Sequence, residues 1–386
     1  MRALKVVYVL VGVAAGLLLL SCGQAVVEEA SSVSDHDERA VAQPVTDSGA
    51  SYRVDPFWPQ DLPDKWLLGQ VIGVAVDSRD HIWVLHRPRS LSARERGAAD
   101  DPPTSECCVP APAVIEFDQA GEVVQGWGGP GPGYEWPSSE HGIFVDHKDN
   151  VWIGGNGDDD GLVLKFTRDG TFLLQIGTPG ETGDSHDTAR LHSPADIGLD
   201  PEENEVYIAD GYTNRRVIVF DADTGEYKRH WGAYGDAPDD GPLATYDPEA
   251  EPSPIFGDTV HCVVISEAGL VYVCDRMNHR LQIFEKDGTF ISEGFIGQQT
   301  AGASVWDIDF SPDPEQTVLY NADGGNHLLW GVRREGLETF ETIGRRGRNA
   351  GQFESPHSLA IDSHGNMYVG ETLDGRRMQK FVPTGN

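Results

Sequence analysis

A unit of short apolar strands recurs six times between Gly69 and Phe381, and it leaves few folds open to this chain. Each unit holds an apolar strand ending in Asp or Ser, a polar turn, a second strand with an aromatic residue and, after a gap, a third strand. The first strands cover residues 72–77, 141–146, 195–200, 261–266, 306–311 and 357–362. Aromatic and β-branched residues favour half-buried strands, so the repeats predict an all-β chain.

A fourth strand, ending in an aromatic residue or Ile before Gly, follows five of the six units. The sixth unit lacks it, because the third strand there ends at Phe381, close to the last residue, Asn386. Residues 51–58 form an extended segment ahead of the first unit, and we expect this N-terminal strand to close the ring. Four-stranded units arranged radially form a six-bladed β-propeller. A β-sandwich or β-helix fits repeats of roughly 45–70 residues poorly.

The N-terminal residues have the features of an export signal. A short basic stretch precedes an apolar run that ends in Leu-Leu-Ser before Cys22, which resembles the bacterial lipoprotein processing box. We expect a lipoprotein signal peptide over residues 1–21, a disordered tether over residues 22–50 with a lipidated Cys22, and the propeller over residues 51–386. An ordinary secretory signal is the alternative. The expected location is the bacterial cell envelope, with a lipid anchor at the outer membrane or cell surface.

The chain is strongly acidic, with 62 Asp and Glu against 29 Lys and Arg and a net charge of -33. Such a surface repels nucleic-acid phosphates and anionic lipid headgroups. We therefore expect no nucleic-acid partner and membrane contact through the lipid anchor only. We expect a monomer that acts on a small-molecule or peptide substrate.

Four cysteines lie in the propeller region. Cys262 and Cys274 are equidistant from Ala268, at the centre of the expected hairpin of the fourth unit, which predicts a cross-strand disulfide in an exported protein. Cys107 and Cys108 are adjacent. The sequence leaves open whether they form a vicinal disulfide or remain two thiols.

Three units begin with histidine: His141, His261 and His357, each five residues before the end of its strand. They belong to the second, fourth and sixth units. Alternate blades of a six-fold ring are related by about 120°, and the first strand of each blade lines the channel, so the imidazoles should converge. Three neutral imidazoles with an open fourth position are typical of catalytic zinc. Histidines that only cap the channel or bond to turns are the alternative.

Three further side chains are expected near these histidines. The second strand of each unit returns antiparallel to the first, so the residues after it lie at the same end of the channel. Aligning the units places Arg87 and Arg276 at one blade position and Tyr212 one residue further along. The alternative is that the arginines pair with the acidic surface and that the tyrosine packs at a blade edge.

Short motifs around these residues follow one another along the chain: His86-Arg87, Glu140-His141-Gly142, Ala209-Asp210-Gly211-Tyr212-Thr213-Asn214-Arg215, Val260-His261, Asp275-Arg276-Met277-Asn278 and Ser355-Pro356-His357. In this order they resemble the lyase half of the peptidylglycine α-amidating enzymes. That family is a six-bladed propeller that cleaves peptidyl-α-hydroxyglycine to a peptide amide and glyoxylate. Residues 278–281, Asn-His-Arg-Leu, also resemble the signature of NHL-repeat propellers.

The resemblance implies a role for each candidate residue. The three histidines would bind zinc, Tyr212 would take the proton of the substrate hydroxyl, and Arg87 and Arg276 would bind the substrate carboxylate or the developing charge. The family also has an Asp directly after the third zinc ligand, where it helps to bind a structural calcium. This chain has Ser358 there, which puts calcium at that position in doubt.

Taken together, these features predict a lipid-anchored, zinc-dependent carbon–nitrogen lyase similar to peptidylamidoglycolate lyase. Its substrate would be an α-hydroxyglycine-like carbinolamide with a carboxylate, and its products would be an amide and glyoxylate. One alternative is a metal-dependent hydrolase of the lactonase kind, for which Asp210, Asp275 or Glu371 could be the base. Another is a non-catalytic NHL-repeat protein that presents a binding surface at the cell envelope.

Overall fold

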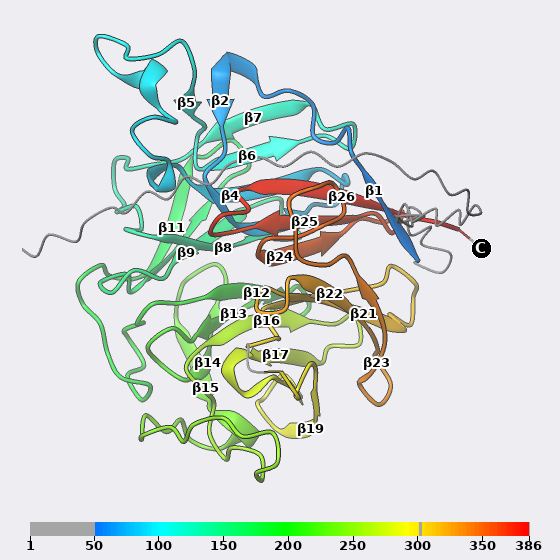
Figure 1. Ribbon diagram of the computed structural model, residues 1–386. Coiled ribbons are helices and arrows are strands. Elements are labelled where there is room, and N and C mark those ends of the chain that lie inside the picture. Colours follow the sequence, from blue (N-terminus) through cyan, green and yellow to red (C-terminus); the bar gives the residue numbers. More distant parts are fainter. Residues whose placement is uncertain (1–50, 301–302, 386) are drawn as a thin grey trace, which may run out of the picture. The chain divides into compact units, whose positions relative to one another are not determined.

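The computed structural model describes residues 51–300 and 303–385, which form six four-stranded antiparallel sheets around a common centre (Figure 1). This is the six-bladed β-propeller that the repeats predict. The expected signal peptide, the tether and Cys22 lie outside the described residues. Within the described ranges, no helix has the length and apolar character that a membrane crossing needs.

Each blade is an antiparallel sheet whose first strand is innermost. In five blades the four strands follow one another in sequence order, and in the last blade the outer strand comes from the N-terminal segment. Blade 1 contains β3 (Gln70–Val76), β4 (Ile82–Arg87), β6 (Val114–Phe117) and β7 (Val123–Trp127). Blade 2 contains β8 (Glu140–Val145), β9 (Val151–Gly155), β10 (Leu162–Phe166) and β11 (Phe172–Gly177). Blade 3 contains β12 (Asp196–Asp200), β13 (Glu205–Asp210), β14 (Arg216–Asp221) and β15 (Tyr227–Trp231).

The second half of the ring repeats this order. Blade 4 contains β16 (Val260–Ile265), β17 (Val271–Asp275), β18 (Arg280–Phe284) and β19 (Phe290–Phe295). Blade 5 contains β20 (Asp307–Phe310), β21 (Val318–Asp323), β22 (Leu328–Arg333) and β23 (Glu338–Ile343). Blade 6 contains β24 (Pro356–Ile361), β25 (Met367–Glu371), β26 (Arg377–Pro383) and β1 (Tyr52–Asp55).

Short elements lie between the blade strands. The strands β2 (Trp66–Leu67) and β5 (Val109–Pro110) form a small parallel pair beside blade 1. The 3-10 helices are η1 (Pro63–Lys65), η2 (Pro88–Ser90), η3 (Gly97–Ala99), η4 (Ala233–Gly235) and η5 (Arg276–Asn278).

The N-terminal strand closes the ring, as the missing outer strand of the sixth unit predicts. β1 pairs antiparallel with β26, from Tyr52 opposite Pro383 to Asp55 opposite Lys380. In blade 5 the third strand continues past Trp330, its last aromatic residue, to Arg333. Arg333 takes the register position that a phenylalanine holds in other blades, so the aromatic signal for the strand end is absent there.

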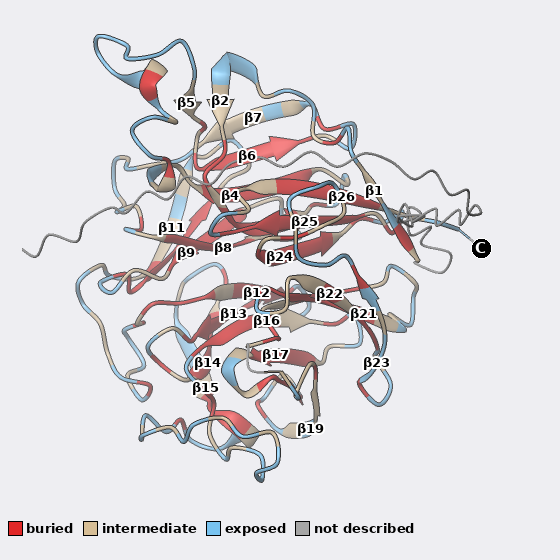
Figure 2. Ribbon diagram, in the orientation of Figure 1, coloured by how far each residue is buried: buried red, intermediate tan, exposed pale blue. Residues whose placement is uncertain are grey.

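The hydrophobic core is a ring of six clusters, each shared by two neighbouring blades. The cluster between blades 1 and 2, for example, contains Trp83 and Phe166, and the next contains Trp152 and Ile218. Figure 2 shows the inner strands as largely buried and the outer strands as increasingly exposed. Because both faces of every blade are packed, the backbone at the channel is held in a fixed place.

The six innermost strands line a central cavity of about 280 Å³. An innermost strand presents an unpaired edge, and side chains of the preceding blade satisfy part of it here. Asp196 accepts a hydrogen bond from the backbone N–H of Val263 at 3.1 Å, and Asp307 accepts one from Leu359 at 3.0 Å. These bonds tie neighbouring strands together beside the channel.

The predicted disulfide is present in blade 4. Cys262 in β16 lies opposite Cys274 in β17, and the two buried sulfurs are bonded. Cys107 and Cys108 are also joined by a disulfide, which answers the question that the sequence left open.

Removing the inter-strand bond should destabilise the protein. We expect the double variant Cys262→Ala/Cys274→Ala to lose about 2–4 kcal/mol of unfolding free energy, because the bond restricts the unfolded chain. Denaturant unfolding measures this loss. The matched control Cys107→Ala/Cys108→Ala should change stability far less, since adjacent cysteines close almost no loop. Equal stability of the wild type and the first variant would contradict this prediction.

Candidate metal centre and active site

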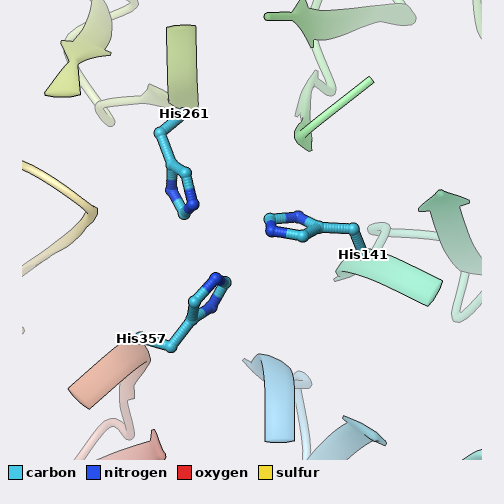
Figure 3. Close-up of side chains that lie close together, drawn as sticks. All are labelled: His141, His261 and His357. Atoms are coloured by element: carbon cyan, nitrogen blue, oxygen red, sulfur yellow. The ribbon is translucent and has the colours of Figure 1, made fainter. Parts of the chain in front are cut away.

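The three predicted histidines converge at one end of the channel. His141 in β8, His261 in β16 and His357 in β24 are all buried, and their ring centroids lie 4.8 to 5.1 Å apart. One ring nitrogen from each lies within 4.8 Å of the other two. Figure 3 shows the rings pointing from three separate strands toward a common point.

Backbone carbonyls orient two of these rings. Nδ1 of His141 lies 2.6 Å from the carbonyl oxygen of Ala195, and Nδ1 of His261 lies 2.5 Å from that of Trp306. A carbonyl only accepts hydrogen bonds, so the proton is on Nδ1 and the lone pair is on Nε2. Ala195 and Trp306 head the inner strands of blades 3 and 5, between the histidine blades. The fold thus presets the tautomer that a metal ligand requires.

The surroundings keep the imidazoles neutral. Burial lowers the pKa of His141 well below its ordinary value, and Arg87 lowers it further. Burial and then Arg276 lower the pKa of His261, and burial and then His141 lower that of His357. Neutral imidazole is the form that binds a metal, so the site is prepared for a cation at neutral pH.

Tyr212 lies between two of the three histidines. It follows β13 of blade 3, and its Oη is 3.0 Å from Nε2 of His141 and 3.1 Å from Nε2 of His261. Ala195, the residue of blade 3 at the level of the histidines, is small and leaves room for the phenol ring. The hydroxyl therefore reaches the same nitrogens that could hold a metal.

Arg276 lies beside the phenol, in η5 at the end of β17. Its guanidinium carbon is 5.3 Å from the ring centre of Tyr212 and 4.9 Å from that of Trp306. Nη2 donates a hydrogen bond to Thr259 Oγ1 at 3.0 Å, and Nη1 donates to Tyr212 Oη at 3.4 Å. All these partners are neutral.

Arg87 ends β4 and is held in a similar way. Nε donates to the carbonyl oxygen of Glu140 at 3.0 Å, Nη1 to Gln70 Oε1 at 3.3 Å, and Nη2 to Asn156 Oδ1 at 2.8 Å. In the part of the chain that the structure describes, neither Arg87 nor Arg276 forms an ion pair with a carboxylate. In so acidic a protein, these two charges remain available to a bound anion.

The carboxylates that a hydrolase would use as a base are engaged elsewhere. Asp210 forms an ion pair with Arg216 at 2.8 Å, and Asp275 forms one with Arg280 at 2.7 Å. Glu371 is paired with Arg377 at 2.5 Å. In each case the acidic residue ends the second strand and the arginine begins the third, so the pairs brace three blades in the same way.

The residues present fit zinc. Three buried, neutral imidazoles from separate rigid strands are a donor set that zinc prefers, and the group contains no other ligand residue. The position of the family's calcium ligand does not fit calcium, because the Ser358 hydroxyl oxygen accepts the N–H of Val74 at 3.0 Å and bonds to Asp307.

A second group of possible ligands, Asp77, His81 and Glu116, has a different explanation. The guanidinium of Arg168 lies among these side chains, 2.6 Å from Asp77 and in contact with Glu116. The arginine supplies the positive charge that a metal ion would supply, so this group is an ion-pair cluster.

Sequence reasoning missed several residues that shape the site: Gln70, Asn156, Thr259 and Trp306. A signal existed only for Trp306, which heads the first strand of the fifth unit as the histidines head theirs. The others lie in or beside connections, where the repeat gives no position to compare.

The comparisons with known proteins agree with this architecture. The NHL repeat family model matches residues 259–284, in blade 4. The chain is a six-bladed β-propeller with one segment that matches the NHL repeat. The streptogramin B lyase structure has the same fold, with a TM-score of 0.52, 12% identity and coverage of 86% of this chain and 98% of that one.

This β-propeller is also similar in sequence to curated proteins of two kinds. It is 24% identical over 338 residues to peptidyl-glycine alpha-amidating monooxygenase B of Xenopus laevis, which covers 82% of this chain and 34% of that protein. It is 27% identical over 266 residues to peptidyl-alpha-hydroxyglycine alpha-amidating lyase 1 of Drosophila melanogaster, covering 64% and 46%. It is 24% identical over 350 residues to human NHL repeat-containing protein 3, covering 86% and 84%. The chain thus spans about a third of the monooxygenase it matches.

Proposed function

We propose that this NHL-repeat propeller is a zinc-dependent lyase that cleaves an N-acyl-α-hydroxyglycine to an amide and glyoxylate. The observation that carries the proposal is the joint placement of three neutral imidazoles, one phenol hydroxyl and two arginines without carboxylate partners. The homology to proteins named as amidating lyases supports the same reaction class. We further propose that a lipid on Cys22 holds the enzyme at the cell envelope.

The residues of the site divide the reaction among them. The three histidines would hold zinc, which when bound supplies a Lewis acid that makes the substrate hydroxyl more acidic. Tyr212 Oη is placed to take the hydroxyl proton, because it lies within hydrogen-bond distance of two ligand nitrogens. Arg87 and Arg276 are placed to bind the carboxylate and hold the substrate in one orientation.

The bond changes balance without a co-reactant. As the hydroxyl proton leaves, its oxygen forms the carbonyl of glyoxylate and the bond from the same carbon to the amide nitrogen breaks. The amide nitrogen then receives a proton, which Tyr212 can return. One α-hydroxyglycine therefore yields one amide and one glyoxylate, and no water is consumed.

Two other functions compete with this proposal. A metal-dependent hydrolase would need a free carboxylate base, whereas Asp210, Asp275 and Glu371 are paired with arginines. A non-catalytic binding protein is favoured by the match to NHL repeat-containing protein 3, which covers as much of this chain as the matches to amidating enzymes do. A non-catalytic function does not explain why Arg87 and Arg276, two half-buried arginines at the histidine end of the channel, have only neutral hydrogen-bond partners among the described residues.

Product analysis separates these functions. We expect metal-loaded protein to convert N-benzoyl-α-hydroxyglycine to benzamide and glyoxylate in equal amounts, measured by chromatography. Benzoate as the product would favour a hydrolase. Unchanged substrate in the presence of folded, metal-loaded protein would favour the binding protein. A lactone substrate incubated in parallel tests the hydrolase directly.

A further inference from the structure

The level of the channel that carries the histidines also carries three residues from the other blades. Ile72, Ala195 and Trp306 occupy the first position of the units in blades 1, 3 and 5. The backbone confirms the equivalence of the last two, because Ala195 donates its N–H to Ala209 at 2.7 Å and Trp306 donates its N–H to Ala322 at 3.1 Å. Trp306 is by far the largest of the three. One side of the site is therefore filled by an indole ring, whereas the equivalent positions in blades 1 and 3 carry much smaller side chains.

The indole of Trp306 is fixed from several directions. Its Nε1 donates to the carbonyl oxygen of Ala303 at 2.7 Å, and a side chain at Gly324 would come within 2.8 Å of the ring. The ring centre lies 5.7 Å from that of His261 and 5.4 Å from that of His357. The indole is thus a rigid wall between two of the metal-binding blades.

This wall holds Arg276. The guanidinium lies 4.9 Å from the indole centre and 5.3 Å from the phenol of Tyr212, so two aromatic rings border it. The adjacent carboxylate, Asp275, forms its ion pair with Arg280 and does not neutralise the charge of Arg276. Nε of Arg276 is buried and has no hydrogen-bond partner. Contact with aromatic faces orients a guanidinium while leaving its charge and its N–H groups for another anion.

We propose that Trp306 is a positioning residue for Arg276, and through it for the carboxylate of the substrate. The inference rests on the proposed lyase function. The hydrogen bond that orients His261 does not depend on the indole, because Nδ1 of His261 donates it to the backbone carbonyl oxygen of Trp306, which any residue supplies. A change of this side chain should therefore alter substrate binding and spare the metal.

A double-mutant cycle on the full chain tests this assignment. We expect Trp306→Leu to raise the KM for N-benzoyl-α-hydroxyglycine about 3- to 30-fold with kcat changed less than about twofold, the range of one cation–π contact. Trp306→Phe, which keeps an aromatic face, should recover most of the loss. In an Arg276→Ala background, Trp306→Leu should have almost no further effect on KM. Zinc content should stay at the wild-type level in every variant.

Three results would overturn the assignment: an equal effect of Trp306→Leu with and without Arg276, a loss carried by kcat alone, or a loss of zinc. Trp127→Leu, in the outer strand of blade 1, controls for general destabilisation and should leave KM unchanged. If the wild type does not turn over the substrate, the lyase proposal fails. The affinity for N-benzoylglycine, measured by calorimetry on the wild type, Trp306→Leu, Arg276→Ala and the double variant, then still tests the coupling. Additive losses of binding free energy in the double variant would reject it.

Discussion

Replacing His141 with alanine is expected to empty the metal centre and to reduce glyoxylate formation to background, and the same holds for His261→Ala and His357→Ala. In the proposed metal centre each imidazole is one of three protein ligands, so its loss leaves a two-ligand site that cannot retain zinc at ordinary concentrations. Loss of only a hydrogen-bond partner of a ligand already costs roughly 10–100-fold in metal affinity, and loss of the ligand itself should cost more. Elemental analysis and turnover are measured on the same samples.

His279 provides a matched control that tests whether the losses of zinc and turnover are specific to the three converging histidines. His279 is also buried in blade 4, but its ring bonds to Ser304 and packs against Tyr246, neither of which belongs to the candidate site. His279→Ala should lower thermal stability and keep both zinc and turnover. If zinc survives in all three variants of the converging histidines, the channel end is not a metal centre.

Tyr212→Phe should separate chemistry from metal binding. The variant removes one oxygen atom and keeps the ring that borders Arg276, so the fold and the zinc content should be unchanged. In the proposed mechanism the phenol oxygen receives the substrate proton, and general-base contributions are about 10²–10⁴ in rate. We expect kcat to fall within this range, while KM changes little.

The control for this variant is Tyr246→Phe, whose hydroxyl bonds to the carbonyl oxygen of Gln298 outside the site. It should retain the wild-type rate. Full activity of Tyr212→Phe on an α-hydroxyglycine, with zinc retained, would leave the metal centre in place and contradict the phenol as the base.

The strand repeat explains why so much of the fold can be predicted. The paired apolar strands recur with fixed ends, so six units give six blades, and the missing outer strand of the last unit predicts the pairing of β1 with β26. The convergence of His141, His261 and His357 follows from the same symmetry, because alternate blades point to one axis. The cross-strand disulfide follows from hairpin register alone.

What the repeat does not predict are contacts made by residues outside it. Asn156 and Thr259 bond to the two arginines from positions beside connections, whose course depends on packing with neighbouring blades. The engagement of Asp275 by Arg280 also needs side-chain geometry, since the sequence shows an acidic residue near the site and not what it is bonded to. The disulfide between Cys107 and Cys108 could not be predicted from the sequence either, because adjacent cysteines can be bonded or remain two thiols.

The central claim is that one metal at the three histidines makes this propeller a lyase. The most direct measurement is the rate of glyoxylate formation from N-benzoyl-α-hydroxyglycine as chelator-stripped protein is titrated with zinc, with bound zinc determined on each sample. We predict a rate that rises in proportion to occupancy and levels off at about one zinc per chain, with one benzamide per glyoxylate. Glyoxylate formation at the same rate in folded, metal-free protein, or none at full occupancy, would contradict the account.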